Sequence, residues 1–205
     1  MDCIKIPKTK NLFRIFNVLP YNQPIDVYLD GTLVASNLKY KDFTSFSYGD
    51  FFKQKIDVFK AGTTKNPIIK SIIKLPAEQI FTVAITGNKG EEIAIPIEED
   101  VTTKPSNESA INRIVNLSPE LPEVDVTFNG NPSANNIEYR DETLYAFLPP
   151  GEYDIVVEDS ETSESVVEGK FSFKTDRIYS IYIIGDIQNI ELLQSVDGNT
   201  YVCRE

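Results

Sequence analysis

Histidine and tryptophan are absent from this chain of 205 residues, and methionine occurs once, at position 1. Histidine is the commonest general base and the commonest metal ligand in proteins. Its absence excludes Ser-His-Asp and Cys-His nucleophile systems, and it excludes most zinc sites. The sequence therefore predicts a protein that is not an enzyme and that needs no metal or cofactor.

Long apolar runs are missing as well. No stretch approaches the length of a membrane span, and the first residues, MDCIKIPKTKNLF, lack the apolar run of a signal peptide. We therefore expect no membrane insertion. The chain is expected either to stay in the cytoplasm, to reach a surface by another route, or to have lost a leader.

The charge is negative and unevenly distributed. The net charge is −11, and an acidic protein repels nucleic acid phosphates, so nucleic acid is not an expected partner. Residues 1–100 carry 13 basic and 12 acidic side chains, whereas residues 101–205 carry 7 and 19. This asymmetry has two interpretations, solubility or head-to-tail attraction between unlike halves of neighbouring molecules.

The sequence repeats itself with an offset of 99 residues. Residues 14–42 read RIFNVLPYNQPIDVYLDGTLVASNLKYKD and residues 113–141 read RIVNLSPELPEVDVTFNGNPSANNIEYRD, with 11 of 29 positions identical. The register resumes between residues 80–87 and 178–185. A period of this size indicates two tandem copies of one domain.

Each copy has the pattern of an all-β domain. Apolar residues alternate with polar ones over 25–30 and again over 124–128, and the dipeptides Asp30-Gly31 and Asn129-Gly130 favour type I′ hairpin turns. Segments 80–86 and 178–184 are apolar on both faces, which suits central strands. About seven strands in 100 residues predict two tandem Ig-like antiparallel β-sandwiches, over 1–100 and 110–205, with a polar linker at 101–109.

Four segments of the chain form a distinctive set: PYNQPIDVYLDGTLVASNLKY, KAGTTKNP (60–67), FTVAITG and the closing IELLQSVDGNTY (190–201). Together they resemble the bacterial family called domain of unknown function 4397, and the closing segment is similar to two-repeat members from spore-forming Firmicutes. The second copy departs from the family at EDSETSES (158–165) and at Thr127. The resemblance implies an Ig-like sandwich on the cell envelope or outside the cell, and it supplies no catalytic residues.

The two cysteines, Cys3 and Cys203, lie near the two chain ends. They could bridge within one molecule if the ends met. Sandwiches joined end to end usually place the ends at opposite poles, so the sequence favours an intermolecular disulfide from Cys203 of one molecule to Cys3 of the next. Two free thiols in a reducing compartment are the alternative.

Acidic and aromatic residues provide further candidates. An inter-domain calcium site would use Glu98, Glu99, Asp100 and Glu108, but their spacing matches no known calcium loop, and a solvated linker explains them better. Asp26 and Asp125 occupy the same repeat position, where a structural hydrogen bond or exposure explains them and a paired-carboxylate hydrolase does not. The aromatic residues of 43–52 suggest either core packing or an exposed docking edge. They are Phe43, Phe46, Tyr48, Phe51 and Phe52.

Two hypotheses for function follow. The first is a structural surface protein that self-associates head to tail into a homopolymer, such as a subunit of a spore or cell-surface layer or fibre. The alternative is an adhesin-like binding module that recognises a glycan or a protein ligand.

Overall fold

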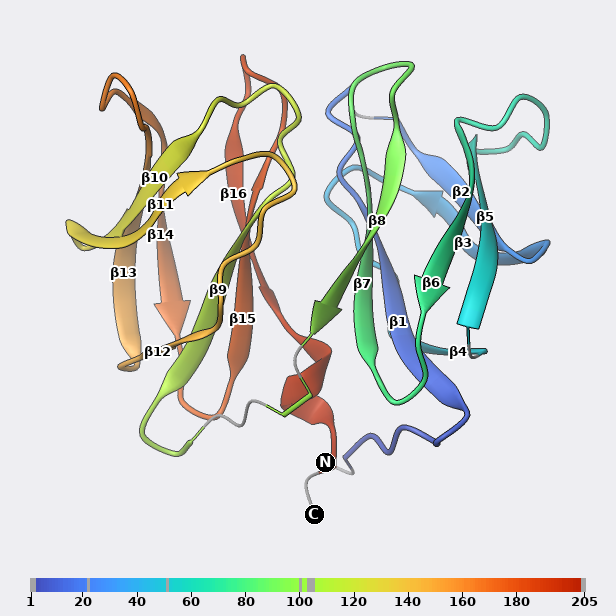
Figure 1. Cartoon of the computed structure of the whole chain (residues 1–205), viewed down its shortest axis with the longest axis horizontal. Coiled ribbons are helices and arrows are strands. Elements are labelled where there is room, and N and C mark those ends of the chain that lie inside the picture. The colour runs from blue at the N-terminus through green and yellow to red at the C-terminus, as the bar shows by residue number, and fades with distance from the viewer. Residues whose placement is uncertain (1–2, 22, 51, 100, 103–105, 204–205) are drawn as a thin grey trace. The chain divides into compact units, whose positions relative to one another are not determined.

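A computed structural model describes residues 3–21, 23–50, 52–99, 101–102 and 106–203. The chain divides into two compact units. The first unit comprises residues 1–102 together with 201–205, and the second comprises residues 103–200. Both are β-sandwiches, which confirms the predicted fold class (Figure 1). In the described part of the chain, no helix has the length and apolar character needed to cross a bilayer.

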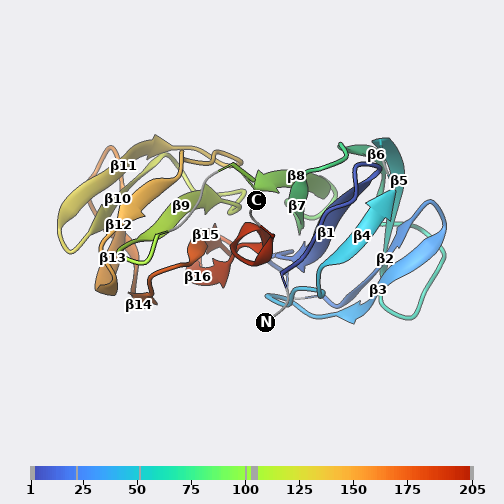
Figure 2. The ribbon, with the colours of Figure 1, turned by 90° about the horizontal axis from the view of Figure 1, so that it is seen from below.

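The first unit contains eight strands in two sheets of four. The strand order is β4-β1-β7-β8 in one sheet and β3-β2-β5-β6 in the other. Figure 2 shows β1 with β4 and β2 with β3 in separate layers. The strands are β1 Lys10–Asn17, β2 Ile25–Leu29, β3 Thr32–Leu38, β4 Ser47–Asp50, β5 Phe52–Lys60, β6 Ile69–Leu75, β7 Ile80–Thr86 and β8 Ile93–Glu99.

The second unit repeats this topology. Its sheets have the orders β12-β9-β15-β16 and β11-β10-β13-β14. The elements are β9 Ala110–Asn116, β10 Val124–Phe128, β11 Asn131–Ile137, β12 Ala146–Leu148, β13 Gly151–Asp159, β14 Ser165–Phe173, β15 Ile178–Ile184, β16 Glu191–Val196 and the 3₁₀ helix η1 Gly198–Tyr201.

Each sandwich contains one parallel strand pair that the sequence analysis did not anticipate. β1 pairs with β7 and β9 pairs with β15 in parallel, while the other ladders are antiparallel. The parallel pairs join strands far apart in the sequence, which leaves room for the long connection that parallel pairing requires. The predicted central segments 80–86 and 178–184 are β7 and β15, and every residue of both strands is buried.

The strand pattern that the sequence displays matches the core. Ile25, Val27 and Leu29 of β2 are 0%, 0% and 6% exposed, and they pack between the two sheets of the first unit. Val124, Val126 and Phe128 of β10 do the same in the second unit. Alternation with a period of two therefore identified the buried face of both strands.

Identical residues of the two repeats perform identical structural tasks. The buried side chain of Asn17 donates to the carbonyl of Leu38 at 2.9 Å and accepts from the amide of Leu19 at 3.2 Å. Asn116 likewise donates to the carbonyl of Ile137 and accepts from the amide of Ser118. These bonds satisfy the carbonyl that ends β3 or β11 and an amide of the loop that follows β1 or β9.

The two hairpin turns have the predicted geometry. The φ angles are 47° at Asp30 and 80° at Gly31, and 50° at Asn129 and 72° at Gly130. Positive φ at both central residues defines the type I′ turn, whose twist matches that of the flanking strands. In both repeats the first turn residue also accepts a backbone hydrogen bond through its side chain, from Lys55 in the first unit and Asp154 in the second.

Replacing Gly31 by valine is expected to destabilise the first unit by about 1–2 kcal/mol, because a β-branched residue resists the left-handed conformation. A Cβ at this position meets no atom within 4 Å, so backbone strain is the whole effect. Gly31→Asn is the matched control, since asparagine tolerates this conformation. Urea denaturation of the three proteins measures the difference, and equal midpoints for valine and asparagine would contradict the turn assignment.

Candidate functional site

The acidic residues at the predicted linker do not form one solvated group. Glu99 belongs to β8 and is fully buried, which corrects its placement in a solvated linker. Its Oε1 accepts a hydrogen bond from Thr82 Oγ1 at 3.1 Å and lies 3.7 Å from the guanidinium of Arg14. Glu98 and Glu108 are exposed, and Asp100 lies outside the described residues. Across the described ranges, no group of three or more acidic, cysteine or histidine residues is arranged to hold a metal ion.

The repeated aspartates are structural. The carboxylate of Asp26 accepts hydrogen bonds from the amides of Asn37 at 2.7 Å and Gly62 at 2.8 Å, and Asp125 accepts one from the amide of Asn136 at 2.9 Å. Asn37 and Asn136 have φ angles of 50° and 52° and lie where the β2–β3 and β10–β11 ladders shift register. The aspartates therefore satisfy amides freed by β-bulges, as the hydrogen-bond interpretation predicted.

A buried arginine cluster occurs in each unit, and the sequence analysis missed both. Arg14 donates from Nε to Thr82 Oγ1 at 2.9 Å, and its guanidinium carbon lies 4.4 Å from the ring centre of Phe43 and 4.7 Å from that of Phe46. Phe43 in turn stacks on Phe16 with the ring centres 3.8 Å apart. Phe43 and Phe46 are half-buried, so these contacts favour the packing interpretation over an exposed docking edge.

The cluster in the second unit uses equivalent positions with altered side chains. Arg113 donates to Ser180 Oγ at 2.9 Å and pairs with Glu142 at 2.7 Å, and it lies 3.8 Å from Asp197. Ser180 and Tyr145 both donate to Asp197 Oδ2, at 3.0 and 2.5 Å. Burial by itself would lower the pKa of Arg113, but the nearby Asp197, with Tyr145, Tyr182 and Glu142, raises the pKa above its usual value.

Each cluster joins neighbouring strands of one sheet, because Arg14 of β1 contacts Thr82 of β7 and Arg113 of β9 contacts Ser180 of β15. An arginine that stays protonated neither gives nor takes a proton at the pH of a cell. The signal that could have found them was present in the sequence. Arg14 and Arg113 open the two repeat segments at the same position, and an arginine before a run of apolar strand residues needs a buried partner.

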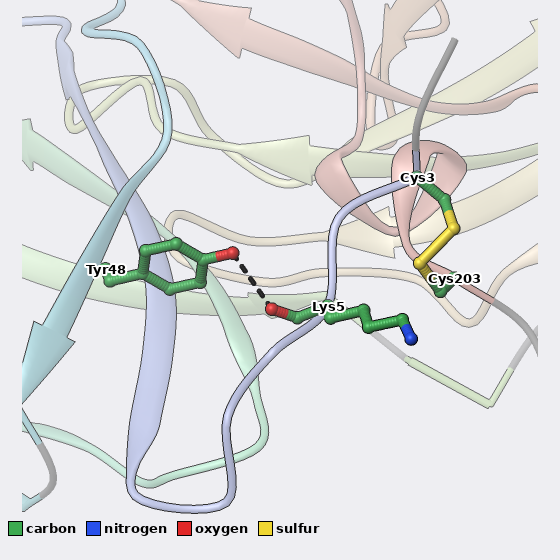
Figure 3. The surroundings of a disulfide bond; sticks show 4 residues. All are labelled: Cys3, Lys5, Tyr48 and Cys203. Atoms are coloured by element: carbon green, nitrogen blue, oxygen red, sulfur yellow. Dashed lines mark hydrogen bonds between the residues drawn. A yellow bond between two sulfur atoms is a disulfide. The ribbon is translucent and has the colours of Figure 1, made fainter.

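The two cysteines of one chain are bonded to each other. The Cys3 and Cys203 Cα atoms are 4.8 Å apart across a disulfide that spans a sequence separation of 200 (Figure 3). The sequence favoured a bond between neighbouring molecules, on the assumption that the chain ends lie at opposite poles. Residues 201–205 instead belong to the first unit, where Val202 bridges Ile4, so both sulfurs are used within the chain.

The remaining aromatic candidates lie apart from the arginine cluster. Tyr48 is 50% exposed on the edge strand β4, and its hydroxyl donates to the carbonyl of Lys5 at 2.9 Å (Figure 3). Tyr48 thereby ties the segment after Cys3 to the sandwich. Phe51 and the side chain of Phe52 lie outside the described residues.

A hollow of about 320 Å³ on the second unit is the best candidate for a ligand site. The edge strands β11 and β12 contribute most of its lining, and β9, β10, β13 and the turn before β13 contribute the rest. The residues that line it are Asn112, Phe128, Asn131, Pro132, Ser133, Ala146, Phe147, Leu148, Pro149 and Tyr153. Sequence reasoning did not find this site, because its residues come from separate strands.

Two of the aromatic residues that line the hollow, Phe128 and Tyr153, are held by contacts with other rings. Phe147 projects from β12 with 68% of its surface exposed. Tyr153 packs edge-on against Phe173, with ring centres 5.7 Å apart, and its hydroxyl donates to the carbonyl of Pro149 at 3.0 Å. Phe128 lies 6.1 Å from both rings. A fixed aromatic floor beside an exposed aromatic side chain loses little conformational entropy on binding.

The first unit has different residues at the equivalent positions. The ladders place Gly49 where the second unit has Leu148, and Gln54 where it has Tyr153. A Cβ at Gly49 would lie 2.3 Å from Asn11 Oδ1, so a larger residue would require the Asn11 side chain to move. Asn11 and Gln54 both donate to the carbonyl of Asp50, at 3.1 and 2.8 Å. The same register places Tyr48 where the second unit has Phe147, so the first unit keeps an exposed aromatic residue but lacks the aromatic floor that Tyr153 supplies in the second.

Comparison with solved structures gives partial likeness to bacterial proteins. The Bacillus anthracis TIE protein matches at 13% identity and a TM-score of 0.27 over 87% of this chain, and this chain spans only 32% of that one. The CBMbc module (family CBM26) of Eubacterium rectale Amy13K, in complex with maltoheptaose, matches at 8% identity and a TM-score of 0.31. The match covers 93% of this chain and 99% of the module. A protein assigned to cell adhesion from Bacteroides uniformis matches at 9% identity and a TM-score of 0.30. The match covers 90% of this chain and 97% of that protein. Likeness at this level assigns neither fold nor ligand.

Among curated proteins, no sequence matches this chain. A family model matches it twice, over residues 12–127 and 112–202, and these two overlapping matches correspond to the two repeats. The matches cover nearly the whole chain and confirm the resemblance read from the sequence. The chain therefore belongs to the family described as domain of unknown function (DUF4397).

Proposed function

We propose that this chain is a non-catalytic binding module whose second sandwich recognises an uncharged carbohydrate. One observation carries the proposal. The described residues that line the hollow include aromatic, amide and hydroxyl side chains but no charged one, although the surrounding half of the chain carries 19 acidic residues. A site kept free of charge on an acidic surface suits a neutral, polar ligand better than a peptide or a nucleotide.

The lining offers the two kinds of contact that a sugar needs. The C–H face of a sugar ring is apolar and packs on an exposed aromatic ring such as Phe147, while ring hydroxyls exchange hydrogen bonds with groups such as Asn131 and Ser133. Few polar groups within a largely apolar lining are typical of small-molecule sites. We expect Phe147 to be the main anchor.

The disulfide supports a location outside the cytoplasm. Disulfides persist in oxidising environments such as the cell surface and are rare where glutathione keeps thiols reduced. A Cys3–Cys203 bond is therefore what a surface or extracellular binding module would carry. The lack of histidine in the whole sequence supports a role without acid–base catalysis.

Replacing Phe147 by alanine is expected to weaken glycan binding about 10–100-fold, because it removes the stacking surface. The test is an array of neutral and acidic oligosaccharides, followed by calorimetry on the neutral oligosaccharides that bind. Ile72→Ala is the matched control, since Ile72 is 67% exposed in the first unit and lies outside the hollow. Binding only to acidic glycans, or equal affinity of both variants, would contradict the proposal.

Self-association is the second candidate function. Leu144 is 92% exposed in the loop before β12, close in sequence to Phe147, and two exposed apolar side chains favour a contact with a second copy. Such a contact would be non-covalent, since Cys3 and Cys203 are bonded to each other. Head-to-tail assembly into a surface layer or fibre would appear in sedimentation velocity as species that grow with concentration, and Phe147→Ala would suppress them.

A further inference from the structure

The chain ends are joined by a small structure that lies outside both sandwich cores and outside the hollow. Ile4 and Val202 form a parallel bridge beside the disulfide. The amide of Ile4 donates to the carbonyl of Tyr201 at 2.8 Å, and the amide of Cys203 donates to the carbonyl of Ile4 at 2.8 Å. We call residues 3–5 and 201–203 the terminal clasp; Figure 3 shows its disulfide and the Tyr48 contact to Lys5.

We propose that the terminal clasp is a redox-controlled bypass for mechanical tension. When the disulfide is closed, a pull applied to the two ends of the chain passes from the first residues through the two sulfur atoms to the last residues. That path is entirely covalent. The polypeptide between the two cysteines, which contains both sandwiches and the hollow, lies outside this path and bears no load.

With the disulfide open, the load must pass through the fold. The two clasp segments run parallel, so a pull on the ends drags them past each other along their length and loads their two hydrogen bonds together. Two main-chain hydrogen bonds are a weak substitute for a covalent bond. After they break, tension reaches β1 along the chain that precedes Lys10 and reaches the edge strand β4 through the hydrogen bond from Tyr48 to Lys5, and the sandwiches unfold under load.

The bond can be opened by ordinary thiol chemistry. A dithiol reductant attacks one sulfur as its thiolate, forms a mixed disulfide and releases the other cysteine as a thiol; its second thiol then releases the first cysteine. Two electrons and two protons pass to Cys3 and Cys203, and the reductant becomes a cyclic disulfide. Cys3 is exposed and Cys203 half-buried, so the reductant has access.

The experiment is single-molecule force spectroscopy on the full chain, held by handles fused before residue 1 and after residue 205. The oxidised protein should extend without any sandwich unfolding. Adding dithiothreitol should produce unfolding steps whose summed length approaches roughly 70 nm, from 200 residues at about 3.5 Å each.

The double variant Cys3→Ser/Cys203→Ser should show the same steps with and without dithiothreitol. Should this variant fail to fold, the wild-type chain reduced in place gives the same comparison. Steps from oxidised wild-type chains would overturn the proposal, as would two titratable thiols in the protein purified without reductant, or a reducible dimer. Glycan binding is a separate readout, so the binding proposal and the tension bypass can fail independently.

Discussion

Replacing Cys3 by serine is expected to lower the free energy of unfolding by about 5 kcal/mol, the largest effect of any single substitution considered. The disulfide closes a loop with a sequence separation of 200. Cross-linking a loop of that length removes chain entropy from the unfolded state, and the loop-closure relation gives about 5 kcal/mol at 25 °C. Cys3 is exposed, so serine costs little packing and the loss reports on the bond itself.

Urea denaturation followed by circular dichroism, without reductant, measures this loss. The wild-type protein in dithiothreitol is the control, because it lacks the same bond with an unchanged sequence. Its midpoint should coincide with that of Cys3→Ser. A midpoint unchanged by either treatment would show that the cysteines are not paired in solution.

Replacing Arg113 by alanine is expected to destabilise the second unit by about 3–5 kcal/mol, the cost of breaking a buried ion pair by removing one partner. Arg113 is 3% exposed and Asp197 is fully buried. Without the guanidinium, Asp197 keeps its hydrogen bonds from Ser180 and Tyr145 but loses the cation that balances its charge.

Arg177→Ala is the matched control in the same unit. The Arg177 side chain is 40% exposed, donates from Nη1 to the carbonyl of Asp176 at 2.8 Å and lies 3.8 Å from the carboxylate of that residue. Both contacts are at the surface, so its removal should change stability by less than about 1 kcal/mol. Thermal unfolding of both variants by calorimetry decides the matter. If the two substitutions have similar effects, the cluster around Arg113 contributes no more than a surface pair.

The tandem sandwich fold could be predicted because its signals are local. The alternation over 25–30, the Asp30-Gly31 turn and the doubly apolar segment 80–86 each reflect the geometry of a few adjacent residues. The repeat at an offset of 99 residues then shows the same strand and turn signals a second time, which supports each assignment. The role of Asp26 could also be predicted, since a polar side chain on the outer face of a strand is expected to form hydrogen bonds, and Asp26 accepts one from the amide of Asn37.

The all-β class, the two repeats, the hairpin turns and the family could be predicted without coordinates, because strand periodicity and turn chemistry are properties of short segments. The pairing of the cysteines, the buried charges and the place where a ligand could bind became known from the folded chain alone. Cys3 meets Cys203, Arg14 meets Glu99, and Phe147 lies near Tyr153 only after the strands have assembled. Such contacts depend on strand order and register over long separations, and no local pattern encodes them.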